Sequence, residues 1–383
     1  MKIAYFTESL PPKTDGVAHT YTKLVETLTD RKIDFRFYSP IVPEDTPFWS
    51  GKVRGVSSVA FPLYDYYRVG IPDCEELSRE LNDFQPDLIQ CAAPTPLGIF
   101  AVNYAKANYI PAVASYHTNF VSYFKYYGWQ LAENIGWAYL RWFHNKFQMN
   151  YVPTNSTKNE LLEHSIENLD LWQRGIEVGR FSPKMRSQAL RESIGAGNLP
   201  IILFVGRLVR EKDLADLADA ASLLKGCGVE HKVVFIGEGP MGDELKERLP
   251  GAHFPGFQHG EQLATWFASA DIFAFPSTTE TFGNVIQEAS ASGVPTVCVN
   301  RGGVVDLVDD GETGFIAEAN NPEDFASKLR FLVDHPEVRQ RMGATARQQV
   351  RQNTWDNING RLLDSYQQVI HRYRGLHALK RAA

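Results

Sequence analysis

Two glutamates lie close to a predicted helix start in the segment DIFAFPSTTETFGNVIQEASASGVPTV. The pattern predicts a strand, a turn and then a helix that begins near Phe282 and Gly283. Backbone N–H groups without intrahelical partners, near Gly283 and Asn284, favour a phosphate at such a helix start. Glu280 precedes the helix, and Glu288 lies one turn after Asn284 on the same face. Their carboxylates could accept hydrogen bonds from sugar hydroxyl groups, although each could equally be a surface charge.

Two cations share one loop after the apolar strand IILFV, namely Arg207 and Lys212. A planar guanidinium and a compact ammonium group in one loop can hold a diphosphate from two sides. The alternative is solvated surface charge, which describes the neighbouring Arg210 and Glu211 well. Whether Arg207 and Lys212 form a diphosphate site or are solvated surface charges therefore depends on the residues around them.

Two further positions follow predicted strands in the first half. The loop SLPPKTDG ends at Gly16, where backbone N–H groups could approach an anion at a helix start. The loop lacks G-x-G-x-x-G, which disfavours a nicotinamide dinucleotide site, and Gly16 could simply serve the turn. His117 follows the strand IPAVA and could reach a ligand there, although a lone histidine is more often structural.

The elements that must position these residues alternate between strands and helices in both halves. This order predicts an α/β fold with two Rossmann-like, doubly wound parallel sheets. We expect a first domain over 1–180 and a second over 181–383. The segment 353–373 predicts an amphipathic helix. Ligands bind at the carboxyl ends of strands in such sheets, so two tandem domains would face a central cleft.

Composition excludes several classes of protein. The chain has 383 residues, with 39 Lys and Arg against 45 Asp and Glu and a net charge of -6, which disfavours a nucleic-acid binder. The four cysteines are scattered, which fits a reducing compartment and neither a zinc site nor a disulfide framework. We expect no targeting segment, because Lys2 is followed directly by a strand pattern. The sequence contains no run of about 18 apolar residues, the length that a helix needs to span a bilayer.

Missing motifs narrow the chemistry further. The chain has no Asp-x-Asp, so we expect no metal of that kind, and it has no P-loop. It also has no G-x-S-x-G, which disfavours an α/β-hydrolase. We expect no cofactor.

Taken in order, these segments resemble the retaining, nucleotide-sugar-dependent glycosyltransferases of family four, which have the GT-B fold. The resemblance covers nearly the whole chain, and its motifs are Gly16, His117, Gly206-Arg207 with Lys212, Gly237-Glu238-Gly239-Pro240, and Glu280 to Glu288. It implies that the first domain is on the acceptor side, that the second domain binds the nucleotide sugar, and that the last helix crosses back to the first domain. SYHTNF, LDLWQRGIEVGRFSP and ESLPPKTDGVAHT resemble the subgroup of sulfoquinovosyl-diacylglycerol synthases and GDP-mannose-dependent α-mannosyltransferases of lipid acceptors.

The resemblance also implies a role for each candidate residue. Arg207 and Lys212 would hold the donor diphosphate, and Gly16 would let the first loop meet the phosphate and the acceptor. Glu280, with the backbone from Phe282 through Gly283 to Asn284, would hold the donor sugar, while His117 would contact it near its C6 hydroxyl. Glu288 would bind the ribose, and the loop at Phe257 and Gln258 would edge the base. The predicted catalytic residues are His117, Glu280, Arg207 and Lys212.

The expected function is a hexosyltransferase that moves a sugar from a nucleotide sugar to a diacylglycerol-type lipid acceptor. A UDP-sugar ranks ahead of GDP-mannose as donor. Eleven aromatic residues between Phe120 and Phe147, with Lys125, Arg141 and Lys146, predict contact with an anionic membrane, or else core packing. We expect a cytoplasmic protein, peripheral on the inner face of the cell membrane. The alternatives are a soluble acceptor such as a sugar phosphate, or a non-catalytic nucleotide-sugar binding module; the oligomeric state stays open.

Overall fold

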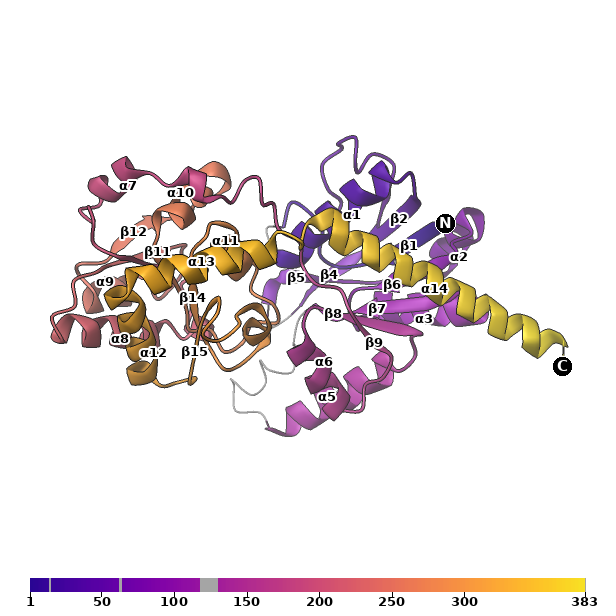
Figure 1. Cartoon of the computed structure of the whole chain (residues 1–383). Coiled ribbons are helices and arrows are strands. Elements are labelled where there is room, and N and C mark those ends of the chain that lie inside the picture. The colour runs from indigo at the N-terminus through magenta and orange to yellow at the C-terminus, as the bar shows by residue number, and fades with distance from the viewer. Residues whose placement is uncertain (14, 62–63, 118–129, 383) are drawn as a thin grey trace. The chain divides into compact units, whose positions relative to one another are not determined.

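The computed structural model describes residues 1–13, 15–61, 64–117 and 130–382. The chain forms two compact units (Figure 1). Unit 1 comprises Met1–Arg174 together with Trp355–Ala383, and unit 2 comprises Gly175–Thr354. The sequence suggested a join after residue 180, whereas the chain passes to unit 2 after Arg174. The guanidinium of Arg174 binds His117 within unit 1, while the N–H of Ile176 donates to the carbonyl of Asn353 within unit 2.

Unit 1 is built on a seven-stranded parallel sheet whose strand order is β3-β2-β1-β6-β7-β8-β9. The central strands β1, β6 and β7 are nearly continuous runs of buried residues, as expected for a sheet covered on both faces. The strands are β1 (Lys2–Phe6), β2 (Asp34–Ser39), β3 (Val53–Gly55), β6 (Leu88–Cys91), β7 (Ala112–Ser115), β8 (Met149–Val152) and β9 (Leu169–Leu171).

Helices surround this sheet, and the last of them comes from the end of the chain (Figure 1). They are α1 (Gly16–Asp30), α2 (Cys74–Phe84), α3 (Pro96–Ala107), α5 (Gln130–His144), α6 (Asn155–Glu163) and α14 (Trp355–Ala382). Helix α14 packs on α1, and it buries Tyr366 in the same hydrophobic cluster as Tyr5 and Tyr21. The terminal segment therefore completes the core of unit 1, and it extends beyond the predicted range 353–373.

An antiparallel hairpin of β4 (Ser58–Phe61) and β5 (Tyr64–Gly70) was not predicted from the sequence. Most of β4 is exposed, so it lacks the alternation of buried and exposed residues that marks a strand in a sequence. Strand β5 ends at Gly70, beside the Leu97 side chain of α3.

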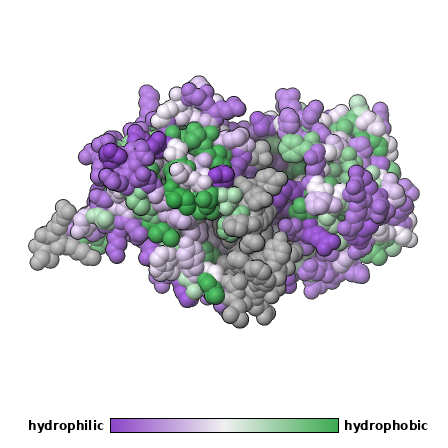
Figure 2. Space-filling model, turned by 180° about the vertical axis from the view of Figure 1, so that it is seen from behind, coloured by the Kyte–Doolittle hydropathy of each residue, from purple (hydrophilic) through white to green (hydrophobic). Residues whose placement is uncertain are grey.

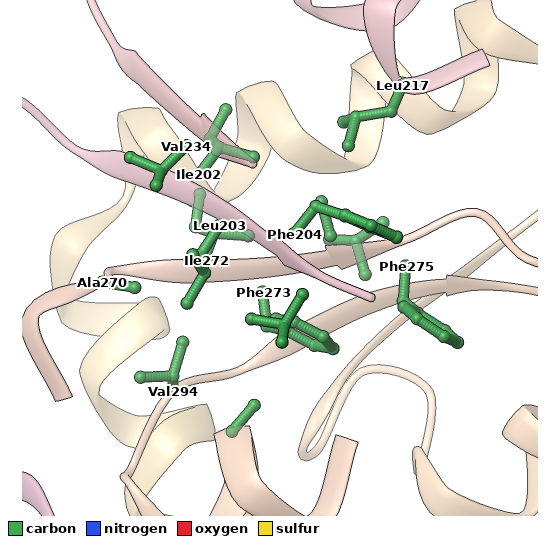
Figure 3. Packing of buried hydrophobic residues seen from close by; sticks show 14 of the residues in the cluster. Ile202, Leu203, Phe204, Leu217, Val234, Ala270, Ile272, Phe273, Phe275 and Val294 are labelled. Atoms are coloured by element: carbon green, nitrogen blue, oxygen red, sulfur yellow. The ribbon is translucent and has the colours of Figure 1, made fainter. Parts of the chain in front are cut away.

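Unit 2 repeats the architecture with six parallel strands in the order β12-β11-β10-β13-β14-β15. Figure 3 shows Phe204, Phe273 and Phe275 among buried aliphatic side chains of this unit. The strands are β10 (Ile201–Val205), β11 (Lys232–Ile236), β12 (His253–Gly256), β13 (Ile272–Phe275), β14 (Thr296–Val299) and β15 (Gly314–Ala317). The helices are α7 (Gln188–Ser193), α8 (Leu214–Gly226), α9 (Gly242–Arg248), α10 (Gly260–Ser269), α11 (Asn284–Ala291), α12 (Pro322–Asp334) and α13 (Pro336–Val350).

The predicted fold class, α/β with two Rossmann-like parallel sheets, is confirmed. Hydrophilic residues cover most of the surface visible in Figure 2, and hydrophobic residues form smaller patches between them. No helix in the described part of the chain combines the length and the hydropathy that a bilayer span requires.

Candidate functional site

In unit 2, two loops meet at the carboxyl ends of the paired strands β10 and β13. The carboxylate of Asp213 accepts hydrogen bonds from the backbone N–H of Thr278 at 2.9 Å and from its hydroxyl at 2.8 Å. The hydroxyl of Thr279 donates to the backbone carbonyl of Glu211 at 2.9 Å. These bonds join the loop after β10 to the loop after β13. No sequence motif pointed to Asp213, although it directly follows Lys212.

The joined loops bring together two of the predicted site residues. Lys212 ends a short 3-10 helix, η2 (Arg210–Lys212), and its ammonium group forms an ion pair with the carboxylate of Glu280. The side chains are 13% and 24% exposed, so the pair is largely sheltered but still reaches solvent. The site thus holds a cation and a hydrogen-bond acceptor for hydroxyl groups side by side, which a sugar diphosphate requires.

A third loop, after β14, fixes the backbone at Glu280. The N–H of Gly303 donates to the carbonyl of Glu280 at 2.6 Å. Gly302 has a φ of +75°, and a Cβ atom there would lie 2.7 Å from the same carbonyl oxygen. Only glycine fits this contact, so the Gly302-Gly303 pair is a sequence signal of the close approach between these two loops.

The motif Gly237-Glu238-Gly239-Pro240 acts through the backbone. Gly237 has a φ of +131°, and a Cβ atom there would lie 2.0 Å from the carbonyl oxygen of Gly206. The loop after β11 can therefore pack directly on the loop that carries Arg207 and Lys212. Arg207 itself is exposed at the carboxyl end of β10.

Helix α11 begins at Asn284, as predicted to within two residues. Gly283 precedes it with a φ of +92°, and no side chain of the described residues caps the backbone N–H groups at this end. These groups, together with the positive end of the helix dipole, suit an anion. Phe282 is buried and anchors the turn before the helix.

Glu288 lies on α11 with one carboxylate oxygen, Oε2, buried and without a hydrogen-bond partner in the described residues. Burial raises the pKa of Glu288 to about 7, Arg180 opposes this rise and Glu177 adds to it. An ionised carboxylate in such surroundings is costly unless hydroxyl or N–H groups donate to it. A ligand with hydroxyl groups would supply those donors.

The loop after β12 carries the other predicted donor-binding residues. Phe257 is 63% exposed, and the side-chain amide of Gln258 donates to the carbonyl of Pro255 at 3.0 Å. Strand β12 is at the edge of the sheet, two strands away from β10. A long ligand would be needed to reach both this loop and Lys212.

Unit 1 contains the two remaining candidates, Gly16 and His117. Gly16 is the first residue of α1 and is exposed, but the carboxylate of Asp15 already accepts from the N–H groups of Val17 and Ala18 at 2.9 and 2.8 Å. These two N–H groups therefore already donate to a negative charge, and a phosphate near Gly16 would be repelled by the Asp15 carboxylate.

His117 is buried, and both of its ring nitrogens have partners. Its Nδ1 lies 2.7 Å from the Arg174 guanidinium, which can only donate, so Nδ1 accepts. Nε2 must then carry the proton, which it donates to the Ser115 hydroxyl at 2.8 Å. Burial, helped by the charge of Arg174, lowers the pKa of His117 well below its ordinary value. The ring is therefore neutral, and Trp172 packs edge-on against it.

The aromatic residues of this segment divide between core packing and exposure, the two alternatives that the sequence left open. Trp137, Phe143 and Phe147 are buried in unit 1, and Trp137 stacks on His164. The helical spacing turns Tyr139 and Trp142 outward instead, with exposures of 39% and 49%. Phe120, Tyr123, Phe124, Lys125, Tyr126, Tyr127 and Trp129 lie outside the described residues.

In the described ranges, no group of three or more His, Cys, Asp and Glu side chains could hold a metal ion. The cysteines Cys74, Cys91, Cys227 and Cys298 are free thiols.

Comparison with known proteins assigns the family. Residues 14–180 match Glycosyltransferase Family 4, and residues 187–349 match Glycosyl transferases group 1. A GDP-mannose-dependent alpha-mannosyltransferase of Corynebacterium glutamicum is 33% identical over 97% of this chain and 89% of the relative. Sulfoquinovosyl transferase SQD2 of Arabidopsis thaliana is 31% identical over 82% of this chain and 62% of the relative.

Solved structures share the fold at lower identity. HepE of Anabaena, in complex with UDP, is 18% identical with a TM-score of 0.77, and the match covers 96% of this chain and all of that one. Sucrose-phosphate synthase of Thermosynechococcus elongatus is also 18% identical, with a TM-score of 0.79 over 97% and 99% of the two chains. The chain therefore belongs to glycosyltransferase family 4, and it is a glycosyltransferase of the GT-B fold that uses a nucleotide sugar.

Proposed function

We propose that this enzyme transfers a hexose, with retention of configuration, from a nucleotide diphosphate sugar to a lipid acceptor. The observation that carries the proposal is the Lys212–Glu280 pair in the joined loops of unit 2, with the uncapped start of α11 in the same unit. The sequence favoured a UDP-sugar over GDP-mannose as donor. The relatives aligned over nearly the whole chain are named for GDP-mannose, which supports GDP-mannose as the first donor to test.

The proposed roles are those that the family resemblance implies, and the surroundings of Lys212, Glu280 and Glu288 support them. Lys212 and Arg207 bind the diphosphate, and Glu280 accepts hydrogen bonds from the sugar, together with the backbone from Phe282 to Asn284. Glu288 accepts from the ribose hydroxyl groups. Phe257 and Gln258 lie beside the base. Gly16 allows the first loop to approach the phosphate and the acceptor, and His117 contacts the donor sugar.

The chemistry is electrostatic stabilisation of the leaving group. When the bond to the sugar breaks, negative charge develops on the nucleoside diphosphate. Lys212, Arg207 and the N–H groups at the start of α11 supply preorganised positive charge for it. With this charge provided by the protein, turnover needs no metal ion.

A panel of donors tests this proposal. We expect GDP-mannose or a UDP-hexose to raise the melting temperature, because a ligand bound only to the folded state stabilises it by mass action. The same donor should yield a transferred sugar with lipid extract as acceptor. Stabilisation by no nucleotide sugar, or transfer with inversion of configuration, would contradict the proposal.

Membrane contact is proposed for the outer face of α5. Ile135, Tyr139 and Trp142 are exposed at spacings of four and three residues, so they share one face. The Lys146 ammonium lies 4.3 Å from the centre of the Trp142 ring, and Arg141 is exposed nearby in sequence. Exposed aromatic rings beside cations suit an anionic interface.

Vesicle flotation measures this contact. We expect binding to anionic vesicles at low salt that weakens with added salt, since each basic residue near such a surface contributes about 1 kcal/mol. The double substitution Arg141→Glu and Lys146→Glu should abolish most of the binding. The exposed pair Lys184 and Lys225 of unit 2, reversed in the same way, is the matched control. If the wild type stays unbound and a water-soluble sugar phosphate saturates the enzyme, the soluble-acceptor alternative replaces the lipid.

A further inference from the structure

The C-terminal helix α14 contributes two buried side chains whose hydrogen bonds lead to His117. Helix α14 packs on α1 (Figure 1), and its residues Tyr366 and Asn359 are fully buried within unit 1. No sequence motif pointed to either residue, and neither has a part in the roles proposed above. Two separate routes connect them to the histidine.

The first route runs from Tyr366 through Gln90 and Ser115 to His117. The hydroxyl of Tyr366 donates to the side-chain oxygen of Gln90 on β6. The amide nitrogen of Gln90 donates to the hydroxyl of Ser115 on β7 at 3.3 Å, and to the hydroxyl of Tyr21 at the same distance. The Ser115 hydroxyl also accepts from Nε2 of His117 at 2.8 Å. The helix is therefore connected to the histidine by a continuous chain of hydrogen bonds.

Gln90 is an amide in an otherwise apolar strand, and it is fully buried. A buried amide is costly unless its oxygen and nitrogen both have hydrogen-bond partners. Tyr366 supplies the donor for the oxygen, and the nitrogen donates to Ser115 and Tyr21. Without the Tyr366 hydroxyl the oxygen would lack its donor, and rotation of the amide toward the Ser115 hydroxyl would replace the present bond. The position of the Ser115 hydroxyl therefore depends on Tyr366.

The second route runs from Asn359 through Trp172. The side-chain oxygen of Asn359 accepts from the indole N–H of Trp172 at 3.3 Å, while its amide nitrogen donates to the hydroxyl of Thr27 on α1 at 3.0 Å. The indole ring lies edge-on to the His117 ring, with 5.3 Å between the ring centres. The Arg174 guanidinium donates to the carbonyl of Trp172 at 3.0 Å and to Nδ1 of His117 at 2.7 Å. Asn359 therefore fixes the residue that packs against the imidazole and orients its arginine partner.

The two routes meet at a ring whose position decides what it can contact. Both ring nitrogens of His117 have partners, so a ligand meets only the remaining surface of a residue that is 9% exposed. The ring stays neutral, because burial lowers the pKa of His117 well below its ordinary value. Displacement by about 1 Å of a group that positions a substrate can lower a rate about 100-fold. Small movements of the His117 ring are therefore expected to affect turnover.

We propose that α14 positions the His117 ring for its contact with the donor sugar, with Tyr366 and Asn359 as the residues of the helix that do so. They act through Gln90 and Trp172 and do not touch the substrate, so they are positioning residues. The inference rests on the proposed contact between His117 and the sugar. It gives the last helix of the chain a part in catalysis besides its part in the core of unit 1.

The substitution Tyr366→Phe removes one hydroxyl group and keeps the ring that packs in the core. We expect turnover to fall roughly tenfold to 100-fold, the scale of a small misplacement of a positioning group. Binding of free GDP or UDP should stay unchanged, because the residues proposed to bind the nucleotide lie in unit 2. Ser365→Ala is the matched control, since Ser365 also joins α14 to the sheet, by accepting from the Tyr151 hydroxyl at 2.8 Å, but lies outside both routes. Its turnover should stay within about twofold of the wild type.

A double-mutant cycle separates positioning from a merely structural role. His117→Ala alone should lower turnover at least as much as Tyr366→Phe does. Tyr366→Phe should then have little further effect on a protein that already lacks His117, because residues that act through one group are not additive. Ser115→Ala removes one hydroxyl group in the middle of the first route, and it gives a second variant for the same cycle. Wild-type turnover in both Tyr366→Phe and Ser115→Ala, or an equal loss with and without His117, would overturn the inference.

The ring nitrogens of His117 provide a readout that does not depend on turnover. In the full chain with isotope-labelled histidine, NMR signals of the ring nitrogens report the tautomer and the hydrogen bond at each nitrogen, and His117→Ala assigns them. We expect the Nε2 signal to shift in Tyr366→Phe and in Ser115→Ala, and to stay unchanged in Ser365→Ala. Such a shift together with wild-type turnover in His117→Ala would support the positioning and refute only the proposed contact with the sugar. An Nε2 signal that is unchanged in both variants would overturn the inference.

Discussion

Replacement of Lys212 by methionine is expected to lower turnover roughly 100-fold to 1,000-fold, the usual cost of losing one preorganised group that stabilises developing charge. Methionine keeps much of the length of the side chain and removes only its charge. The ammonium of Lys212 is held in place by Glu280 and by the loop that Asp213 anchors to Thr278. Steady-state kinetics with the best donor measures this loss.

Arg210→Met is the matched control for this prediction, because Arg210 lies in the same short helix but is exposed. Its turnover should stay within about twofold of the wild type, as usual for surface substitutions. Arg207→Ala should weaken binding of the nucleoside diphosphate by about 2–3 kcal/mol. Wild-type turnover should persist in excess EDTA. Loss of activity in EDTA with recovery on addition of manganese would assign the leaving-group charge to a metal instead of to Lys212.

Replacement of Glu288 by glutamine is expected to weaken binding of free GDP or UDP by about tenfold or more. The buried Oε2 of Glu288 needs donors, and ribose hydroxyl groups would provide them. Glu280→Gln should instead lower turnover while free nucleotide still binds, because Glu280 is paired with Lys212 in the joined loops. Calorimetry with the two variants distinguishes these roles, and the reverse pattern would mean that the two glutamates exchange functions.

The affinity for the nucleotide should also depend on pH, in a direction that follows from the raised pKa of Glu288. Hydroxyl groups that donate to an ionised carboxylate lower its pKa, so nucleotide binding should release protons near pH 7, where Glu288 is half ionised. Affinity in the wild type should therefore rise as the pH increases through about 7, and it should be flat in Glu288→Gln.

The same group affects the stability of the free protein. The pKa of Glu288 is higher in the folded protein than its ordinary value of 4.5, so the folded state binds more protons between about pH 4.5 and 7. Stability contributed by this group is thus present below pH 4.5 and is lost as the pH rises to about 7. The melting temperature of Glu288→Gln without ligand should exceed that of the wild type at pH 8. A lower melting temperature would show that the carboxylate has partners that stabilise its charge.

Much of the fold could be read from local patterns. Strand β10 is a continuous apolar run, and β1 and β6 are apolar apart from Lys2 and Gln90. Helix α11 lies between Gly283 and Gly293. Such signals depend on neighbours in the sequence, which is why the strand and helix alternation predicted two parallel sheets. The exposed hairpin β4-β5 lacks such a pattern and was missed.

The sequence alone determined the fold class and the family. The order of Gly206-Arg207, Lys212 and the two glutamates along the chain can be recognised without knowledge of the tertiary structure. Only the tertiary structure decided which partners those side chains have. Asp213 binds Thr278, and Arg174 fixes the tautomer of His117, across separations of 65 and 57 residues. Burial also decided the charge of Glu288 and His117, since the pKa of a group depends on the solvent and charges around it in space.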